Sequence, residues 1–454
     1  MKVKISTSIH HFSMESSLLP VSRVSSAVLG GFVLLVHLFF PVRAGALPSM
    51  WQVNYGGKLD DSAQAVQQTS DGGYIVVGWT RSFGGDQDCY IIKLNSNGEE
   101  VWPETKRYGG KGNQRANAVV QTSNGGYIIA GVTDSTESGM EDCYLIRLDR
   151  DGNRVGNDKT YGGSSDDSAN SIQKTSDGNY IIAGSTKSFG GQDCYIVKFD
   201  SNLQEIWSRH FGTDGNDSLN FIQETSDQGF IAAGWTQSFE GSNRRSSVVK
   251  LGSDGSVNWY RTFGGGIHDA AYSVAEISGV GYLVAGVASS PPTGDNCYVR
   301  KLDKSGSFIW EKTYGGSGDD AAYSLQLTSD GGYVLAGEKS SSGTNGKDCY
   351  CVKVDYLGDT AWEKTYGWSG DDICYCIQPT KDGGYVLAGA TLTAAYGLEL
   401  YIIKTDSKGN TTARQGGPGG SSSRNSPPSY VNPDQIFHLD SGGCFLHSIL
   451  LTCR

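Results

Sequence analysis

The feature that most constrains this chain is an internal repeat of about fifty residues. The dipeptide Tyr-Gly or Phe-Gly recurs at intervals of 50 to 53 residues. Its seven copies stand at Tyr55, Tyr108, Tyr161, Phe211, Phe263, Tyr314 and Tyr366. A fixed period of this length is typical of solenoids and propellers, in which each repeat forms one structural unit. The chain is therefore expected to fold as seven similar units.

Each copy carries four segments with the alternation expected of β-strands. In the sixth copy these segments are 321–328, 332–339, 349–355 and 360–366. β-branched and aromatic residues fill them, and turns such as 329–332 (SDGG) separate them. The chain holds 63 Gly but only 11 Pro, which favours tight turns over disorder. Four strands in roughly 50 residues match one propeller blade. We therefore predict an all-β, seven-bladed β-propeller of four-stranded blades.

The two ends of the array predict a closed ring. A Trp-containing segment ends most copies, at Trp102, Trp207, Trp259, Trp310 and Trp362, and copy two has Val155 there instead. Trp51 stands before the first Tyr-Gly, whereas the seventh copy ends at 401–410 without such a segment. The N-terminal strand around Trp51 is therefore expected to complete the last blade. Closure of this kind removes exposed sheet edges, whereas an open solenoid needs polar caps.

The motifs WxxxYGG, DGGY and DCYIIKLDxxG resemble those of repeat propellers found in exported bacterial and archaeal proteins. The resemblance covers about residues 50 to 406. The pattern KLDxxGxxxW is also similar, more distantly, to quinoprotein-type propeller repeats. That resemblance implies that the Trp strand is outermost and that its indole lies between neighbouring blades. It implies little about activity, because propellers host many functions.

The N-terminal segment, residues 1–46, reads as an export signal. Lys2, Lys4 and Arg23 precede an apolar run at 27–41, and small residues follow at 44–46. The run is short for a membrane-spanning helix, so a cleaved signal peptide is the preferred interpretation and an uncleaved anchor the alternative. The expected location is secreted, periplasmic or at the cell surface, with membrane contact only through this segment.

The expected propeller spans residues 47–406, and residues 407–454 form a tail. This tail is rich in Gly, Ser and Pro, which is typical of a flexible linker. The formal net charge of −11 argues against a nucleic-acid partner, because phosphate binding needs basic surfaces. A protein or a carbohydrate remains as partner, and the propeller is expected to act as a monomer.

The cysteines follow the repeat. Five of the ten occupy one strand position, namely Cys89, Cys143, Cys194, Cys297 and Cys349, where copies four and seven have Ser246 and Leu400. A position that accepts Cys, Ser or Leu indicates a small buried side chain, so free thiols are expected. Equivalent positions in adjacent blades are expected to lie too far apart for a disulfide. Disulfides that involve Cys351, Cys374 or Cys376 are the alternative.

No cofactor is predicted. The chain has seven His, none paired at zinc-ligand spacing. Turns such as 149–153 (DRDGN) look superficially like calcium loops, but other copies lack the oxygen ligands, so hairpin turns are the preferred interpretation. Calcium remains open as an alternative.

One face of the ring is expected to be acidic. The loop that enters the first strand of a blade ends with an aspartate in six of seven copies: Asp61, Asp167, Asp217, Asp269, Asp320 and Asp372. These carboxylates either contact cations or cationic ligands, or cap their own turns by accepting backbone N–H groups. Their presence in nearly every copy favours capping.

Departures from the repeat on the same face are the candidate ligand contacts. They are Arg115, Arg244, Arg245, His268, Trp368 and Tyr396. Arg, Trp, Tyr and His on loops are frequent binding residues, although drift in unconstrained loops gives the same pattern.

We therefore expect an exported, non-catalytic binding or scaffold propeller that acts through its acidic loop face. No residues match the motifs of common hydrolases or nucleotide-binding proteins. Two alternatives remain. One is an enzyme with its active site at the channel mouth, either quinoprotein-like or polysaccharide-degrading. The other is a calcium-dependent carbohydrate-binding adhesin.

Overall fold

The computed structural model describes residues 27–29, 32–34 and 50–416, apart from 104–105, 136–138, 213–214, 238–242, 290–293, 341–345, 369, 395 and 413–414. Two compact units result, residues 1–47 and 48–454. The first contains a short hairpin of β1 (Ala27–Leu29) and β2 (Phe32–Leu34). The expected cleavage region at 44–46 and most of the C-terminal tail lie outside the described residues. Among the described residues, no helix has the length and apolar character needed to cross a membrane.

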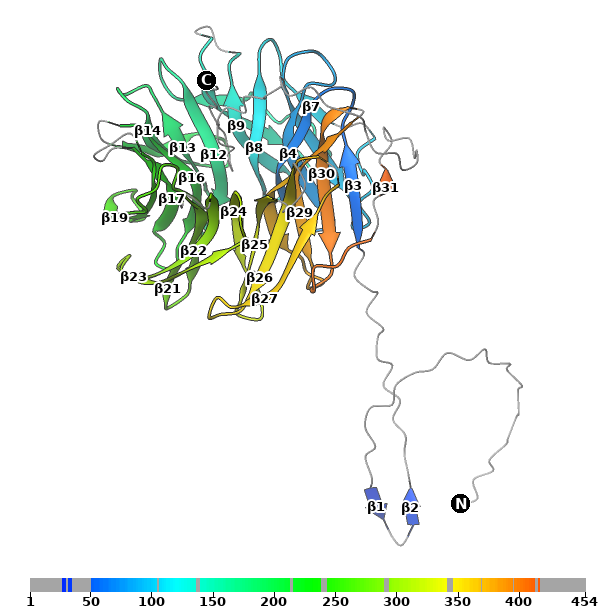
Figure 1. Ribbon diagram of the computed structural model, residues 1–454. Coiled ribbons are helices and arrows are strands. Elements are labelled where there is room, and N and C mark those ends of the chain that lie inside the picture. Colours follow the sequence, from blue (N-terminus) through cyan, green and yellow to red (C-terminus); the bar gives the residue numbers. More distant parts are fainter. Residues whose placement is uncertain are drawn as a thin grey trace, which may run out of the picture. The chain divides into compact units, whose positions relative to one another are not determined.

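The second unit is a seven-bladed β-propeller, which confirms the predicted fold (Figure 1). Blades 1 to 3 comprise β4 (Asp61–Gln68), β5 (Tyr74–Thr80), β6 (Asp88–Leu94) and β7 (Lys106–Tyr108); β8 (Gln114–Gln121), β9 (Tyr127–Thr133), β10 (Asp142–Leu148) and β11 (Lys159–Tyr161); and β12 (Asp167–Lys174), β13 (Tyr180–Thr186), β14 (Asp193–Phe199) and β15 (Glu205–Phe211). Blades 4 and 5 comprise β16 (Asp217–Glu224), β17 (Phe230–Thr236), β18 (Arg245–Leu251) and β19 (Val257–Phe263); and β20 (Ala270–Ile277), β21 (Gly281–Ser289), β22 (Asp295–Asp303) and β23 (Phe308–Tyr314). Blade 6 comprises β24 (Asp320–Leu327), β25 (Tyr333–Ser340), β26 (Lys347–Val354) and β27 (Thr360–Tyr366).

Blade 7 is completed by the N-terminal strand, as predicted. It contains β28 (Asp372–Pro379), β29 (Tyr385–Thr393), β30 (Gly397–Thr405) and then β3 (Trp51–Tyr55), which pairs antiparallel with β30. A fifth, two-residue strand, β31 (Gln415–Gly416), runs parallel to β3 on its outer side. The closing strand is therefore held on both edges by segments from the other end of the chain.

Indole rings join neighbouring blades through their outermost strands. The Trp51 ring lies 5.7 Å from the Tyr74 ring of blade 1, and its Nε1–H donates to the Ser96 carbonyl at 3.0 Å. The same contact recurs between blades 4 and 5, where the Trp259 and Tyr282 rings are 5.7 Å apart. Gly306 adopts a φ of +77° beneath the Trp259 ring, and a Cβ there would lie 2.9 Å from ring atoms. Glycine is thus required by both conformation and space.

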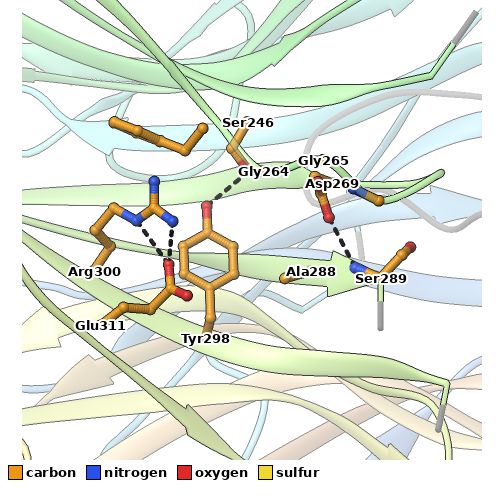
Figure 2. Close-up of a pocket in the computed structure, with 11 residues that line it drawn as sticks. Ser246, Gly264, Gly265, Asp269, Ala288, Ser289, Tyr298, Arg300 and Glu311 are labelled. Carbon is orange, nitrogen blue, oxygen red and sulfur yellow. Dashed lines mark hydrogen bonds and ion pairs between the residues drawn. The ribbon is translucent and has the colours of Figure 1, made fainter. Parts of the chain in front are cut away.

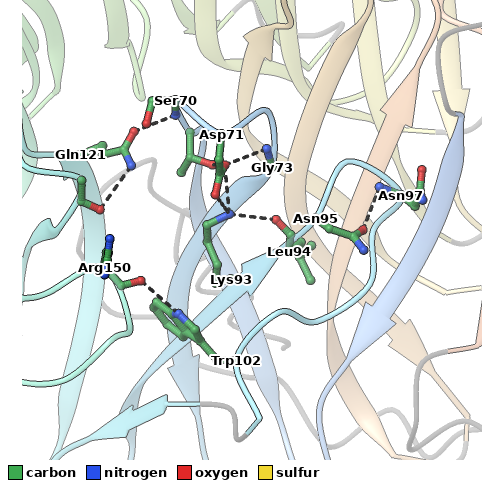
Figure 3. A network of polar contacts seen from close by, with 12 residues as sticks. Ser70, Asp71, Gly73, Lys93, Leu94, Asn95, Asn97, Trp102, Gln121 and Arg150 are labelled. Carbon is green, nitrogen blue, oxygen red and sulfur yellow. Dashed lines mark hydrogen bonds and ion pairs between the residues drawn. The ribbon is translucent and has the colours of Figure 1, made fainter. Parts of the chain in front are cut away.

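A second recurring contact joins strands within a blade. Lys93 is almost fully buried, and its ammonium contacts the Asp71 carboxylate of the β4–β5 turn at 3.0 Å (Figure 3). Burial by itself raises the pKa of Asp71. Hydrogen bonds from Thr69, Gly73 and Lys93 outweigh it and lower that pKa to about 2. Equivalent pairs occur at Lys198–Asp177, Lys250–Asp227, Lys353–Asp330 and Lys404–Asp382.

The prediction of free thiols was wrong for Cys349 and Cys374, and the alternative of a disulfide that involves Cys374 is confirmed. Cys349 of β26 forms a disulfide with Cys374 of β28, with the two Cα atoms 5.1 Å apart. Equivalent cysteines do not meet. Cys89, Cys143 and Cys297 each share a core cluster with an alanine on the inner strand of the next blade, such as Cys89 with Ala116. At the junction of blades 6 and 7 that small residue is itself a cysteine. The other cysteines among the described residues are free: Cys89, Cys143, Cys194, Cys297, Cys351 and Cys376.

Candidate binding site on the loop face

The six aspartates that open the inner strands are all buried, with at most 2% of their surface exposed. One Asp61 carboxylate oxygen accepts the Gly57 N–H at 2.8 Å and the Ser82 hydroxyl at 2.7 Å. Asp320 accepts the Gly316 N–H at 2.7 Å in the same way. Equivalent backbone bonds reach the others from Gly163, Gly266 and Trp368 to Asp167, Asp269 and Asp372. Asp217 occupies the same place at the start of β16.

This arrangement makes the aspartates turn caps. Burial raises the pKa of Asp61 and of Asp320 against the lowering effect of these hydrogen bonds. Within the described part of the chain, no group of three or more His, Cys, Asp or Glu side chains has the geometry of a metal site. Cation binding by the aspartates stays a prediction without a structural observation in its favour.

Carboxylates that open the third strands are more accessible. Burial and the nearby charges of Asp167 and Asp166 raise the pKa of Asp142 to about 6. Burial also raises the pKa of Asp88 and of Asp193. This face therefore loses part of its negative charge as the pH falls through 6, and its attraction for cations weakens accordingly.

Three of the six predicted contact residues come together between blades 4 and 5. The Arg244 N–H donates to the Ile267 carbonyl at 3.2 Å, so that Arg244 and His268 pair as a parallel bridge. Arg245 begins β18 beside them. The His268 N–H donates to the Ser289 hydroxyl at 3.1 Å, which fixes the loop between the blades.

The other three predicted residues lie in other blades. Arg115 of blade 2 forms an ion pair with Glu141 at 2.7 Å. Trp368 enters blade 7, is about half exposed, and lies with its ring 5.8 Å from the Tyr401 ring. Tyr396 is half-buried in the β29–β30 turn of the same blade. The six residues thus do not form one site.

Arg244 has an unusual environment for a cation. Its guanidinium carbon lies 4.1 Å from the centroid of the Trp235 ring, within cation–π range. Burial lowers its pKa. Among the described residues, no carboxylate pairs with this guanidinium and no acceptor hydrogen-bonds to it. A flat guanidinium held on an aromatic ring keeps its N–H groups available for a bidentate anion.

The innermost strands carry a second asymmetry that the sequence reading missed. Each has a β-bulge near its start, and blades 1 to 4 place amides there: Gln64, Asn117, Asn170 and Asn220. Blades 5 to 7 place Tyr272, Tyr323 and Tyr375 there instead. The Tyr272 and Tyr323 rings are 5.1 Å apart, and the Tyr323 and Tyr375 rings 5.8 Å. Aligning the seven copies at the conserved strand start would have revealed this split.

A pocket of roughly 100 Å³ lies between blades 4 and 5 (Figure 2). The loop 264–266 forms one wall, and Tyr298, Arg300 and Glu311 of blade 5 form another. Ser246 of blade 4, two residues after Arg244, closes its inner end. The pocket is thus adjacent to the loop that carries His268.

Among the comparisons with known proteins, a match to one family model agrees with the propeller fold. A family model described as a beta-propeller domain of unknown function, DUF5122, matches residues 69–99, which include β5 and β6. No curated protein matches the chain. Two crystal structures of Sqt1 from Chaetomium thermophilum are similar at 13% identity. The match to the first has a TM-score of 0.48 and covers 82% of this chain and 86% of that chain. The match to the second has a TM-score of 0.47 and covers 75% of this chain and 82% of that chain. At this identity the likeness identifies neither a ligand nor an activity.

Proposed function

We propose that this protein is an exported, non-catalytic binding propeller that holds an acidic glycan through Arg244 on its loop face. The observation that carries the proposal is the Arg244 guanidinium, which lies on Trp235 at 4.1 Å with no acceptor among the described residues. A half-buried cation without an anionic partner carries a desolvation cost that a bound carboxylate or sulfate offsets.

Export is supported by two independent features. The apolar run at 27–41 follows basic residues and precedes small ones. The Cys349–Cys374 disulfide is of a kind that persists in oxidising compartments and is rare in the cytosol. We accordingly place the protein in a secreted, periplasmic or cell-surface location, with the propeller acting as a monomer.

A glycan array tests the ligand. The full-length protein is applied to glycans bearing uronate or sulfate groups and to neutral glycans of the same backbone. We expect the acidic glycans to be bound preferentially, with binding that weakens as salt is raised. Charge-assisted bidentate bonds contribute about 1.5–3 kcal/mol, so Arg244→Ala is expected to weaken binding by roughly 10- to 100-fold.

The adjacent arginine supplies a matched control. Arg245→Asp restores the residue type of the repeat, and we expect it to leave both folding and the preference for acidic glycans in place. Arg244→Lys keeps the charge but not the planar fork, so intermediate binding is expected. An array without acidic-glycan signal, or equal binding by Arg244→Ala and the unmodified protein, would contradict the proposal.

A further inference from the structure

The junction between blades 4 and 5 departs from the repeat at several positions that meet in one pocket. Ser246 stands where five other blades have Cys, and Ala288 where five have Thr. Both changes remove side-chain volume. Arg300 stands where the other six blades have Ile or Val, whose side chains are buried. A pocket is thus opened and a charge is introduced at a place that is otherwise apolar.

The hydrogen bonds of this junction are rearranged accordingly. In blade 6 the Tyr350 hydroxyl donates to the Glu363 carboxylate at 2.6 Å. In blade 5 the equivalent Glu311 accepts a hydrogen bond from Arg300 Nε–H at 2.7 Å instead. The Tyr298 hydroxyl instead reaches across to blade 4 and donates to the Ser246 oxygen at 2.8 Å (Figure 2).

Stability alone does not account for the ion pair. Ion pairs near the protein surface contribute little to stability, and this pair keeps 16% of the Arg300 side chain and 30% of the Glu311 side chain exposed. Six blades fold with an aliphatic residue at this position, so the scaffold does not need the charge. The Arg300 guanidinium lies 4.3 Å from the Phe263 ring centroid and 5.6 Å from that of Phe308, which holds it in a fixed orientation.

The pocket keeps unused hydrogen-bonding capacity. The Ser246 oxygen accepts from Tyr298, so its own proton remains able to donate, and no described residue accepts it. Arg300 binds one Glu311 oxygen through two nitrogens, which leaves the third nitrogen and the second oxygen available. Ser246 is 2% exposed, so this capacity faces the pocket and not bulk solvent. Donors and an acceptor thus surround one small space beside an aromatic ring.

We propose that this pocket binds the hydroxyl-bearing edge of a saccharide. Each sugar hydroxyl both donates and accepts, which fits the hydroxyl of Ser246, the guanidinium of Arg300 and the carboxylate of Glu311 together. The Phe263 ring adds an apolar part to the wall of the pocket. A volume of roughly 100 Å³ admits several water-sized groups, hence a few hydroxyl-bearing carbons of a terminal residue. The site uses no contact with Arg244 and is a second site beyond the proposed function.

Ligand-observed NMR and calorimetry test this with a panel of neutral methyl glycosides and the full-length protein. We expect at least one glycoside to bind, and Arg300→Val to weaken it at least tenfold. Because valine is the residue of blade 6 at this position, Arg300→Val is expected to melt at or above the temperature of the unmodified protein. Ser246→Cys also restores the repeat, removes a strong donor and is expected to weaken binding similarly.

Two equivalent acids provide the matched control. Glu311→Gln is expected to weaken glycoside binding, whereas Glu363→Gln, the same change one blade along, leaves it unchanged. Arg244→Ala is expected to retain neutral-glycoside binding, so failure of the Arg244 proposal and failure of this one are distinguishable. The inference is overturned if no glycoside binds, or if folded Arg300→Val and Glu311→Gln bind within twofold of the unmodified protein.

Discussion

The disulfide between blades 6 and 7 gives a prediction whose magnitude follows from the fold. Cys374→Ala removes the crosslink and places Ala opposite Cys349. The junction of blades 6 and 7 then resembles the junction of blades 1 and 2, where Cys89 and Ala116 occupy the same two positions and pack without a bond. No new kind of cavity is therefore created. The variant isolates the contribution of the crosslink more cleanly than most cysteine substitutions do.

The expected loss comes from the unfolded chain. The disulfide joins residues 25 apart in sequence. Closing a loop of that length costs the unfolded chain entropy equivalent to about 3.5 kcal/mol at 25 °C. For a folded unit of roughly 360 residues, this corresponds to a fall in Tm of about 5 °C.

Urea unfolding followed by tryptophan fluorescence, with and without reductant, measures the effect. We expect reductant to lower the urea midpoint of the unmodified protein to that of Cys374→Ala, and to leave the variant unchanged. Cys297→Ala removes a free thiol and is expected to keep the response to reductant. The reasoning is refuted if Cys374→Ala unfolds with the midpoint of the oxidised unmodified protein, or if reductant still destabilises it.

The same packing predicts a disulfide that does not yet exist. Ala322 of blade 6 lies in one core cluster with Cys297 of blade 5, as Cys374 does with Cys349. We expect Ala322→Cys to form a second crosslink, detectable as a cysteine-linked peptide pair in non-reducing mass spectrometry. Recovery of two free thiols from folded, oxidised protein would show that the junctions differ in geometry.

Three further predictions concern closure, turns and pH. Deleting residues 47–55 is expected to destabilise the whole ring, and a truncated protein that melts like the full chain would disprove closure. Gly306→Ala is expected to lower the free energy of unfolding, measured by calorimetry, by about 2–4 kcal/mol, because its Cβ meets Trp259 and its φ is positive. Gly331→Ala also has a positive φ but open space around it, so its loss is expected to be about 1 kcal/mol. The Thr328 hydroxyl and a lysine ammonium lower the pKa of Asp330 to about 2. The ionised Asp330 therefore stabilises the folded protein above about pH 4, and this contribution is lost as the pH falls through 2. Because that carboxylate is well exposed, Asp330→Asn should flatten the pH dependence of unfolding in urea by only about 0.5 kcal/mol.

The repeat allowed the blade pattern and the closing strand to be predicted, because strand alternation and turn glycines are local signals. In copy six the observed strands lie within two residues of the expected ones. A disulfide at Cys374 was only the alternative prediction, and its partner Cys349 was not identified, because the two cysteines occupy non-equivalent positions of two copies. Only the packing of adjacent blades shows that these positions face each other. The pocket was missed because Ser246 and Ala288 create it by what their side chains lack.

One substitution shows how two departures can depend on each other across blades. The Trp position of blade 2 was assigned to Val155, but Val155 is equivalent to Val101 and Gly156 stands at the Trp position. The turn of blade 3 has Leu203 where a Gly stands beneath the Trp in the other turns of this type. Leu203 is buried with Tyr180 and adopts a φ of 60°, which is unfavourable for a branched side chain. Its buried side chain occupies the space that the missing indole leaves. Such compensation is visible in sequence only once the contact itself is known.

The pairing of β3 with β30 also sets the order of events during synthesis. The first propeller strand to leave the ribosome, β3, has no partner until about 350 further residues have been made. At roughly 5–20 residues per second, this interval is about 20–70 seconds. During it, six blades can assemble while both the first strand and the open edge of the seventh remain unpaired. A ring that pairs its first strand with its last blade when finished is thus most exposed to mispairing just before completion, when a neighbouring copy could supply the missing strand.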